Sequence, residues 1–124
     1  PFYFLISPKL GFIKVNVKDN QISVLFRFLS LNRMQSFTLN KELMDAYCIE
    51  VEEKKQYIGM VPLTDINFND IIDFYIKQQL KLDDCDITIK VNVSETQGHH
   101  AVPTIVSQML KHIECSLSVT LSHN

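Results

Sequence analysis

Three stretches of the chain alternate apolar and polar residues almost without error, and this pattern limits the possible folds more than any other feature. They are residues 13–18, 87–93 and 116–122. Successive side chains of a β-strand point to opposite faces, so a period of two predicts strands with one buried and one solvated face. Such strands form a sheet that helices cover on a single side. The other side then remains open to water or to a partner.

Length and charge restrict the class of protein. The 124 residues, of which 46% are hydrophobic, suit a single domain (1–124) with a buried core. The 12 basic and 14 acidic residues are spread along the chain without a long basic run. We therefore expect no nucleic-acid partner, because binding phosphates needs clustered lysines and arginines. No apolar run approaches the ~20 residues of a membrane span, so we expect no membrane partner either.

Cysteine usage indicates the redox environment. Cys48, Cys85 and Cys115 are odd in number, widely spaced and without a CxxC pair. Small secreted scaffolds carry a denser, even set that forms disulfides. We therefore predict reduced thiols and an intracellular, cytoplasmic location.

The segment 11–30 is predicted to be a β-hairpin. Asp19 and Asn20 tolerate the positive φ of a two-residue type I′ turn between the alternating runs. The register that this turn sets agrees with the hydrophobic pattern. The apolar residues that then share one face are Ile13, Val15, Val17, Ile22, Val24 and Phe26.

An apolar group interrupts the face of this hairpin that should be solvated. Leu25 and Leu29 lie there beside Arg27, and the hairpin register adds Phe12 from the neighbouring strand. Apolar side chains with an arginine on an otherwise polar sheet are typical of interfaces. Phe12, Leu25, Arg27 and Leu29 are therefore the candidate interface residues. The alternative is that residues 2–6 or 31–34 fold back and cover them within the same domain.

The remaining elements are read from periodicity and capping residues. Strands are expected at 2–6, 36–39, 86–94 and 115–123, and a second hairpin at 49–61. Asn40 is a candidate cap of a short helix that carries Tyr47. The first main helix follows the predicted N-cap Asn67, and the second begins at Pro103. The apolar stripe of the first main helix consists of Phe68, Ile71, Ile72, Tyr75, Ile76 and Leu80.

The order of these elements predicts the fold class. A helix between strands 86–94 and 115–123 makes the two strands parallel if they share a sheet. We expect an α+β two-layer sandwich with a mixed, mostly antiparallel sheet, two main helices packed on one face and a C-terminal βαβ unit.

Few residues have the spacing of a chemical site. His99, His100, His112 and Cys115 are the candidate metal ligands, since imidazole and thiolate suit zinc. In the alternative reading His112 complements the dipole of its helix and Cys115 is buried. We predict no metal and no cofactor.

Two further groups have weak catalytic signatures. The carboxylates Asp83, Asp84 and Asp86 lack the alternating ligands and glycine of a calcium loop, which favours a solvated connection. Cys48 is a possible nucleophile, but nothing in the local sequence places a base beside it.

Pro1 suggests an enzymatic alternative. A desolvated N-terminal secondary amine can act as a general base. Pro1 and the short apolar strand after it resemble the start of tautomerase-family enzymes. That family places a helix directly after its first strand, whereas a hairpin is expected here. The resemblance ends at that element.

These observations favour binding over catalysis. The leading hypothesis is a non-catalytic protein–protein interaction domain (a subunit, adaptor or assembly factor) that binds another protein or itself through the outer sheet face or a sheet edge. The first alternative is a small enzyme that uses Pro1 or a pocket of histidine, cysteine and aspartate residues. A third option is a small-ligand or lipid-binding domain with a cavity between the helices and the sheet.

Overall fold

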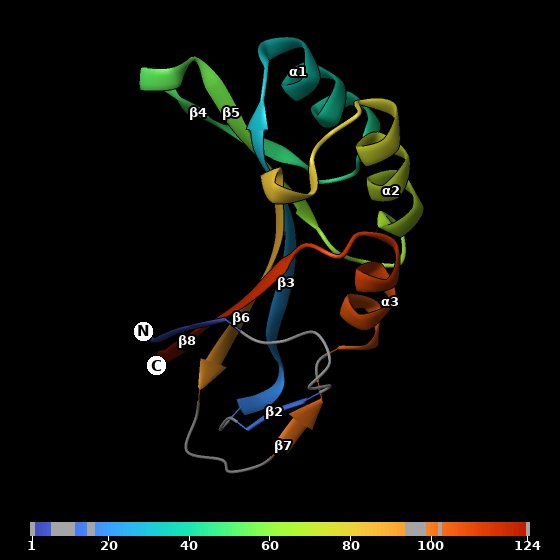
Figure 1. The fold of residues 1–124 in the computed structure, drawn as a ribbon. Coiled ribbons are helices and arrows are strands. Elements are labelled where there is room, and N and C mark those ends of the chain that lie inside the picture. Colours follow the sequence, from blue (N-terminus) through green and yellow to red (C-terminus); the bar gives the residue numbers. More distant parts are fainter. Residues whose placement is uncertain (1, 6–11, 15–16, 94–98, 102, 124) are drawn as a thin grey trace.

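A computed structural model of the chain describes residues 2–5, 12–14, 17–93, 99–101 and 103–123. Its main feature is a six-stranded sheet, in which a single strand pair, β6 with β8, is parallel (Figure 1). A separate two-stranded sheet joins β2 (Phe12–Lys14) to β7 (His99–Ala101). In spatial order the six strands are β1 (Phe2–Leu5), β8 (Ser116–His123), β6 (Cys85–Val93), β3 (Val17–Leu31), β5 (Gln56–Pro62) and β4 (Tyr47–Val51).

The α-helices α1 (Arg33–Glu42), α2 (Phe68–Lys77) and α3 (Thr104–His112) lie on the same side of this sheet (Figure 1). Short 3₁₀ turns, η1 (Glu52–Lys54) and η2 (Leu82–Asp84), precede β5 and β6. The predicted α+β sandwich with a mixed sheet is therefore confirmed. The βαβ unit is also confirmed, because α3 connects β6 to β8, which runs parallel beside it. None of the described helices is long and apolar enough to cross a membrane.

The helix α1 replaces the strand predicted at residues 36–39, and that prediction was wrong. Asn32 forms a capping box with Gln35: the Gln35 N–H donates to Asn32 Oδ1 at 2.7 Å, and the Asn32 N–H donates to Gln35 Oε1 at 2.9 Å. The helix buries Ser36 and Leu39. The prediction that Asn40 caps a short helix is also wrong, because Asn40 lies inside α1.

The core lies between the sheet and the helices, where the alternation predicted it. Ile87, Ile89 and Val91 of β6 are at most 1% exposed. Phe28 of the central strand β3 contacts Phe74 of α2, with ring centroids 5.0 Å apart. Phe74 is buried in place of Ile76, which is 63% exposed although the predicted stripe included it.

The predicted hairpin at residues 11–30 is wrong. Asp19 and Asn20 lie inside β3, which is continuous from Val17 to Leu31. The register between β3 and β6 shifts between Val17 and Ile22, so the two turn-forming residues are accommodated as an irregularity within the strand. The strand β3 pairs with β6 from Val17 to Phe28 and with β5 from Leu25 to Leu31, and neither partner is the segment that the hairpin required. The strand β2 pairs instead with β7, Ile13 opposite His100, and Val15 lies outside the described residues.

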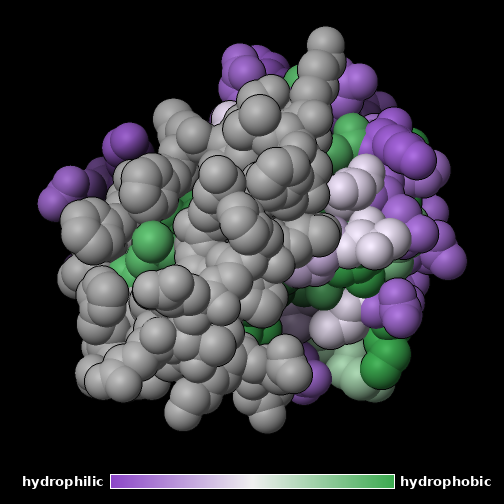
Figure 2. Space-filling view, turned by 90° about the horizontal axis from the view of Figure 1, so that it is seen from below, coloured by the Kyte–Doolittle hydropathy of each residue, from purple (hydrophilic) through white to green (hydrophobic). Residues whose placement is uncertain are grey.

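Both ends of the chain lie side by side (Figure 1), because β1 runs antiparallel to β8 with Phe2 opposite Leu121. This confirms a strand near the start of the chain, although Pro1 itself lies outside the described residues. Figure 2 shows the molecule from below, where hydrophilic residues lie along the outer edge at the right and hydrophobic residues are also exposed beside them.

Candidate interaction surface

The strand β3 has one face toward the helices and one away from them. Phe26 and Phe28 are fully buried on the helical side. Leu25 and Arg27, which alternate with them, therefore lie on the opposite side, called here the outer sheet face. Leu29 follows Phe28 at a shift of the register between β3 and β5, and we assign it to the outer sheet face by its alternation with Phe28. Leu25, Arg27 and Leu29 are all half-buried. The role of Leu25, Arg27 and Leu29 in binding stays a prediction.

The fourth predicted interface residue, Phe12, is separated from these three in the sheet pairing. It lies in β2 and pairs with Ala101 of β7, not with Arg27 as the hairpin register required. The misplacement has the same cause as the wrong hairpin, since Arg27 lies opposite Asp86 of β6 and Met60 of β5.

The hairpin of β4 and β5 extends the apolar group over the outer sheet face. Leu25 pairs with Pro62 and Arg27 with Met60, while Ile49 of β4 pairs with Ile58. Outer residues of three adjacent strands therefore form one surface, called here the apolar outer patch. Its members are Leu25, Leu29, Tyr47, Ile49, Val51, Ile58, Met60 and Pro62. The most open of them are Tyr47, 48% exposed, and Ile49, 47% exposed.

The two segments proposed as a cover do not lie over this patch where the structure describes them. Residues 2–5 form β1, at the edge of the sheet farthest from β4. Leu31 is buried in the core on the helical side, and Arg33 and Met34 begin α1.

The other half of the outer sheet face is polar. Its residues on β6 and β8 are Asp86, Thr88, Lys90, Ser116, Ser118 and Thr120. Thr88 and Ser118 are only 6% and 3% exposed, so this half is closed to solvent around them. The Thr88 hydroxyl is buried without a hydrogen-bond partner. Lys90 and Ser116 are exposed, so the polar half is open at these residues and closed around Thr88 and Ser118.

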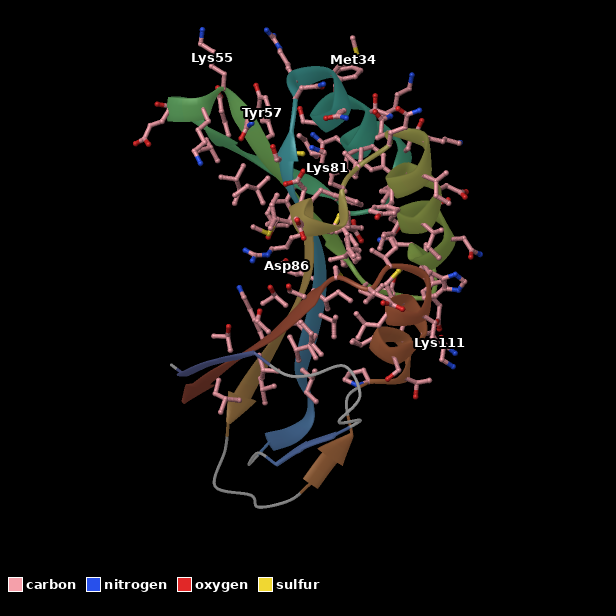
Figure 3. The ribbon with its side chains drawn as sticks, in the orientation of Figure 1. Met34, Lys55, Tyr57, Lys81, Asp86 and Lys111 are labelled. Atoms are coloured by element: carbon pink, nitrogen blue, oxygen red, sulfur yellow. The ribbon has the colours of Figure 1, made fainter. Side chains whose placement is uncertain are left out.

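An ion pair marks the border between the two halves. Arg27 Nε donates to Asp86 Oδ1 at 2.7 Å, and Arg27 Nη2 donates to the other carboxylate oxygen. The side chains are 26% and 14% exposed, respectively. Asp86 lies on the side of the sheet away from α2 and α3 (Figure 3). The guanidinium of Arg27 thus forms a bidentate ion pair with the Asp86 carboxylate within the fold.

Of the candidate metal ligands, His112 and Cys115 have described side-chain surroundings, and both pack within the fold. His112 is exposed at the end of α3, where its ring contacts Phe68 edge to face with centroids 5.8 Å apart. Burial raises the pKa of the Cys115 thiol to about 12, which keeps it protonated at neutral pH. His99 and His100 lie in β7. Over the described part of the chain, no three histidine, cysteine or carboxylate residues are grouped as metal ligands.

Among the other chemical candidates, Cys48 and Asp86 make structural contacts. Cys48 Sγ lies 3.8 Å from both Ser36 O and Asn40 Oδ1, neither of which is a base, and burial raises its pKa. Asp83 and Asp84 form the turn η2, while Asp86 holds Arg27. Pro1 lies outside the described residues.

A second apolar area lies on α1. Met34 and Phe37 are 72% and 68% exposed and, with Arg33, line a depression of about 430 Å³. Met34 lies at the top of the molecule in Figure 3, beyond the sheet. This area comes from one short helix, whereas the apolar outer patch joins three strands.

Comparison with protein-family models, curated proteins and solved structures gives no match.

Proposed function

We propose that this protein is a non-catalytic protein–protein interaction domain, which acts as a subunit, adaptor or assembly factor. It binds another protein through the apolar outer patch and the adjoining edge strand β4. The observation that carries this proposal is the continuity of apolar side chains over β3, β5 and β4 on the face without helices, with Tyr47 and Ile49 about half exposed.

The composition of the patch suits an interface. Single exposed apolar residues are common on any surface, but a contiguous apolar group with a polar border is typical of binding sites. The patch combines an aromatic ring, aliphatic side chains and a methionine, with the Arg27–Asp86 pair at its border. Full burial of a side chain such as Ile49 contributes roughly 1 kcal/mol or more of transfer free energy, given that half of it is already covered.

The edge strand adds a second mode of recognition. β4 is the terminal strand of the sheet beside the patch. Its sequence, YCIEV, contains no lysine and no proline, the residues that commonly protect an edge from pairing. An extended segment of a partner can therefore add to the sheet there and place alternate side chains against the patch.

The state of the titratable groups supports binding over catalysis. Burial raises the pKa of Cys85 and Cys115 to about 12, and Asp86 is ion-paired with Arg27. The proposed intracellular, cytoplasmic location rests on the odd number and wide spacing of the cysteines.

Affinity purification from the native source with matched surface variants tests the proposal. Ile49→Lys changes the patch, and Ile76→Lys changes an equally apolar residue that is 63% exposed on α2. We expect a stoichiometric partner with the wild type and with Ile76→Lys, and its loss with Ile49→Lys. A partner that both variants retain, or that both lose, contradicts the proposal, as does the absence of any partner or self-association.

The half-buried part of the patch needs a separate test. We expect the Leu25→Ser, Leu29→Ser double variant to remain folded by circular dichroism while its binding weakens. If this variant unfolds instead, the two leucines belong to the core and the binding surface is restricted to β4 and β5.

A further inference from the structure

We propose that the partner at β4 is a second copy of this chain, and that the two β4 strands pair antiparallel about a two-fold axis to give one continuous sheet. This inference rests on the proposed function and names the partner of the same surface. It goes beyond it by fixing the symmetry and the register of the contact.

The free edge of β4 provides the hydrogen-bonding groups. β4 pairs with β5 from Tyr47 opposite Met60 to Val51 opposite Gln56. Within the described residues no strand lies on its other side. In an antiparallel strand, alternate residues direct their N–H and C=O groups to opposite sides, so part of the β4 backbone faces outward without a strand partner. Figure 1 shows the β4–β5 hairpin projecting away from α2 and α3, which leaves room for a second copy.

The sequence of β4 is complementary to a second, antiparallel copy of itself. A two-fold axis at Ile49 places the two Ile49 side chains opposite each other and Tyr47 opposite Val51 of the second copy. These are the residues that β4 contributes to the outer sheet face, so every outer pair is apolar. The remaining pair, on the helical side, is Cys48 opposite Glu50. All five residues of β4 are paired in this register.

Charge, side-chain orientation and the length of the overlap each disfavour one of the neighbouring registers. Glu50 is the only charged residue of β4. A shift that moves the axis to Glu50 places two carboxylates directly opposite each other, which is destabilising. A shift by one residue places apolar outer residues opposite residues of the helical face. Moving the axis to Cys48 leaves only Tyr47, Cys48 and Ile49 paired within the strands. The register centred on Ile49 is therefore preferred.

The paired edges unite the two apolar outer patches across the axis. Tyr47 and Ile49, the most exposed members of each patch, become the central residues of the joined surface. An interface made by one strand and its neighbouring residues buries a small area, and interfaces of this size are typically weak and reversible. We therefore expect a dimer that forms over the micromolar range of protein concentration.

Sedimentation equilibrium of the purified chain tests the assembly. We expect a concentration-dependent dimer for the wild type and for Ile76→Lys. For Ile49→Lys we expect a dissociation constant raised about tenfold or more, because two ammonium groups meet at the axis. A wild type that stays monomeric up to submillimolar concentration overturns the inference, and so does an Ile49→Lys variant that dimerises as the wild type does.

Cysteine crosslinking tests the register. In a Cys48→Ser background, Ile49→Cys places two thiols opposite each other, and copper–phenanthroline with dissolved oxygen as oxidant is expected to join them as a disulfide. Val51→Cys in the same background is the control, since its opposite residue is Tyr47. Equal crosslinking of the two variants overturns the register. If the wild type is monomeric but captures a different protein in an Ile49-dependent way, self-pairing fails while the proposed function stands.

Discussion

The side-chain amide of Asn67 exchanges two hydrogen bonds with the backbone of Met44. The Met44 N–H donates to Asn67 Oδ1 at 3.2 Å, and Asn67 Nδ2 donates to the Met44 carbonyl oxygen at 2.8 Å. A third bond runs from Asn67 Nδ2 to the Pro62 carbonyl oxygen at 3.1 Å. Asn67 is 2% exposed, so this amide joins the loop after α1, the end of β5 and the start of α2 in the protein interior.

We expect Asn67→Ala to lower the free energy of unfolding by about 2–4 kcal/mol, because it leaves several buried backbone groups without partners. Asn69→Ala is the matched control: Asn69 is exposed in the first turn of the same helix, and a change within about 0.5 kcal/mol is expected. Urea denaturation of both variants measures the difference. Equal stability of the two would contradict the structural role of the Asn67 amide.

Asn67 also shows where local sequence rules reach their limit. Its position just before α2 agrees with the predicted N-cap, but its side chain makes no capping hydrogen bond. The local pattern identified the residue and the boundary correctly. It carried no information about Met44, whose backbone lies 23 residues away in the sequence and takes the amide instead.

The prediction of the strand β6, which depends on a local pattern, was correct, and the prediction of the hairpin, which depends on a distant pairing partner, was wrong. Alternation in residues 87–93 predicted the buried face of β6, because a half-buried sheet imposes this period wherever the strand is placed. The turn at Asp19 and Asn20 was favoured locally, yet β3 pairs with a strand whose contact residues lie 59 positions away, as in Arg27–Asp86. Pairing partners at that distance leave no trace in a single sequence.

The position of the apolar outer patch, whose role in binding stays a prediction, was predictable in part for the same reason. Leu25 and Leu29 were found because they break the polar face of their own strand. Ile58 and Met60 were missed, because the sequence of a hairpin does not say which of its faces the helices cover. Only the pairing of β5 with β3, in which Met60 lies opposite Arg27, places β5 residues on the same face as Leu25.

The ion pair between Arg27 and Asp86 is expected to stabilise the fold. Because both side chains are largely buried, removing one leaves the other charge with less compensation. We expect Arg27→Met and Asp86→Ala each to cost about 1–3 kcal/mol, and the double variant to cost less than their sum by about 1 kcal/mol or more. A double-mutant cycle from urea denaturation measures this coupling. Strict additivity would show that the contact contributes nothing to stability.

Gly59 is expected to be needed for the packing of α1 on β5. A Cβ atom on Gly59 would meet Leu39 Cδ2 and would lie 3.0 Å from Leu31 Cδ1. Both leucines are at most 1% exposed, so neither moves easily. We expect Gly59→Ala to cost about 1–3 kcal/mol by overpacking. Leu39→Val removes the nearest methyl group, so the double variant is expected to be less destabilised than the sum of the single changes. Thermal denaturation measures all three, and a neutral Gly59→Ala would contradict the close contact.

The three thiols are expected to react in a fixed order. Cys48 is half-buried, whereas Cys85 and Cys115 are 2% and 4% exposed. Burial raises the pKa of all three, most strongly that of Cys85 and Cys115. Since the thiolate is the nucleophile, we expect Ellman's reagent near neutral pH to label Cys48 first in the native protein and the other two only after denaturation. Mass spectrometry of the labelled peptides identifies the site, and early labelling of Cys115 would contradict its burial.

The same two buried thiols predict a loss of stability at alkaline pH. The pKa of Cys85 and of Cys115 is about 12 in the folded protein, against 9.0 for an unperturbed thiol. Above pH 9 the unfolded chain therefore releases protons that the native protein retains, so the free energy of unfolding falls as pH rises. Between about pH 9 and 10.5 we expect a decrease of roughly 1 kcal/mol per pH unit for each thiol. Urea denaturation across this range measures the slope. Cys115→Ala lowers the stability at every pH by lost packing, but it is expected to make the slope shallower. An unchanged slope would show that the thiol ionises equally in both states.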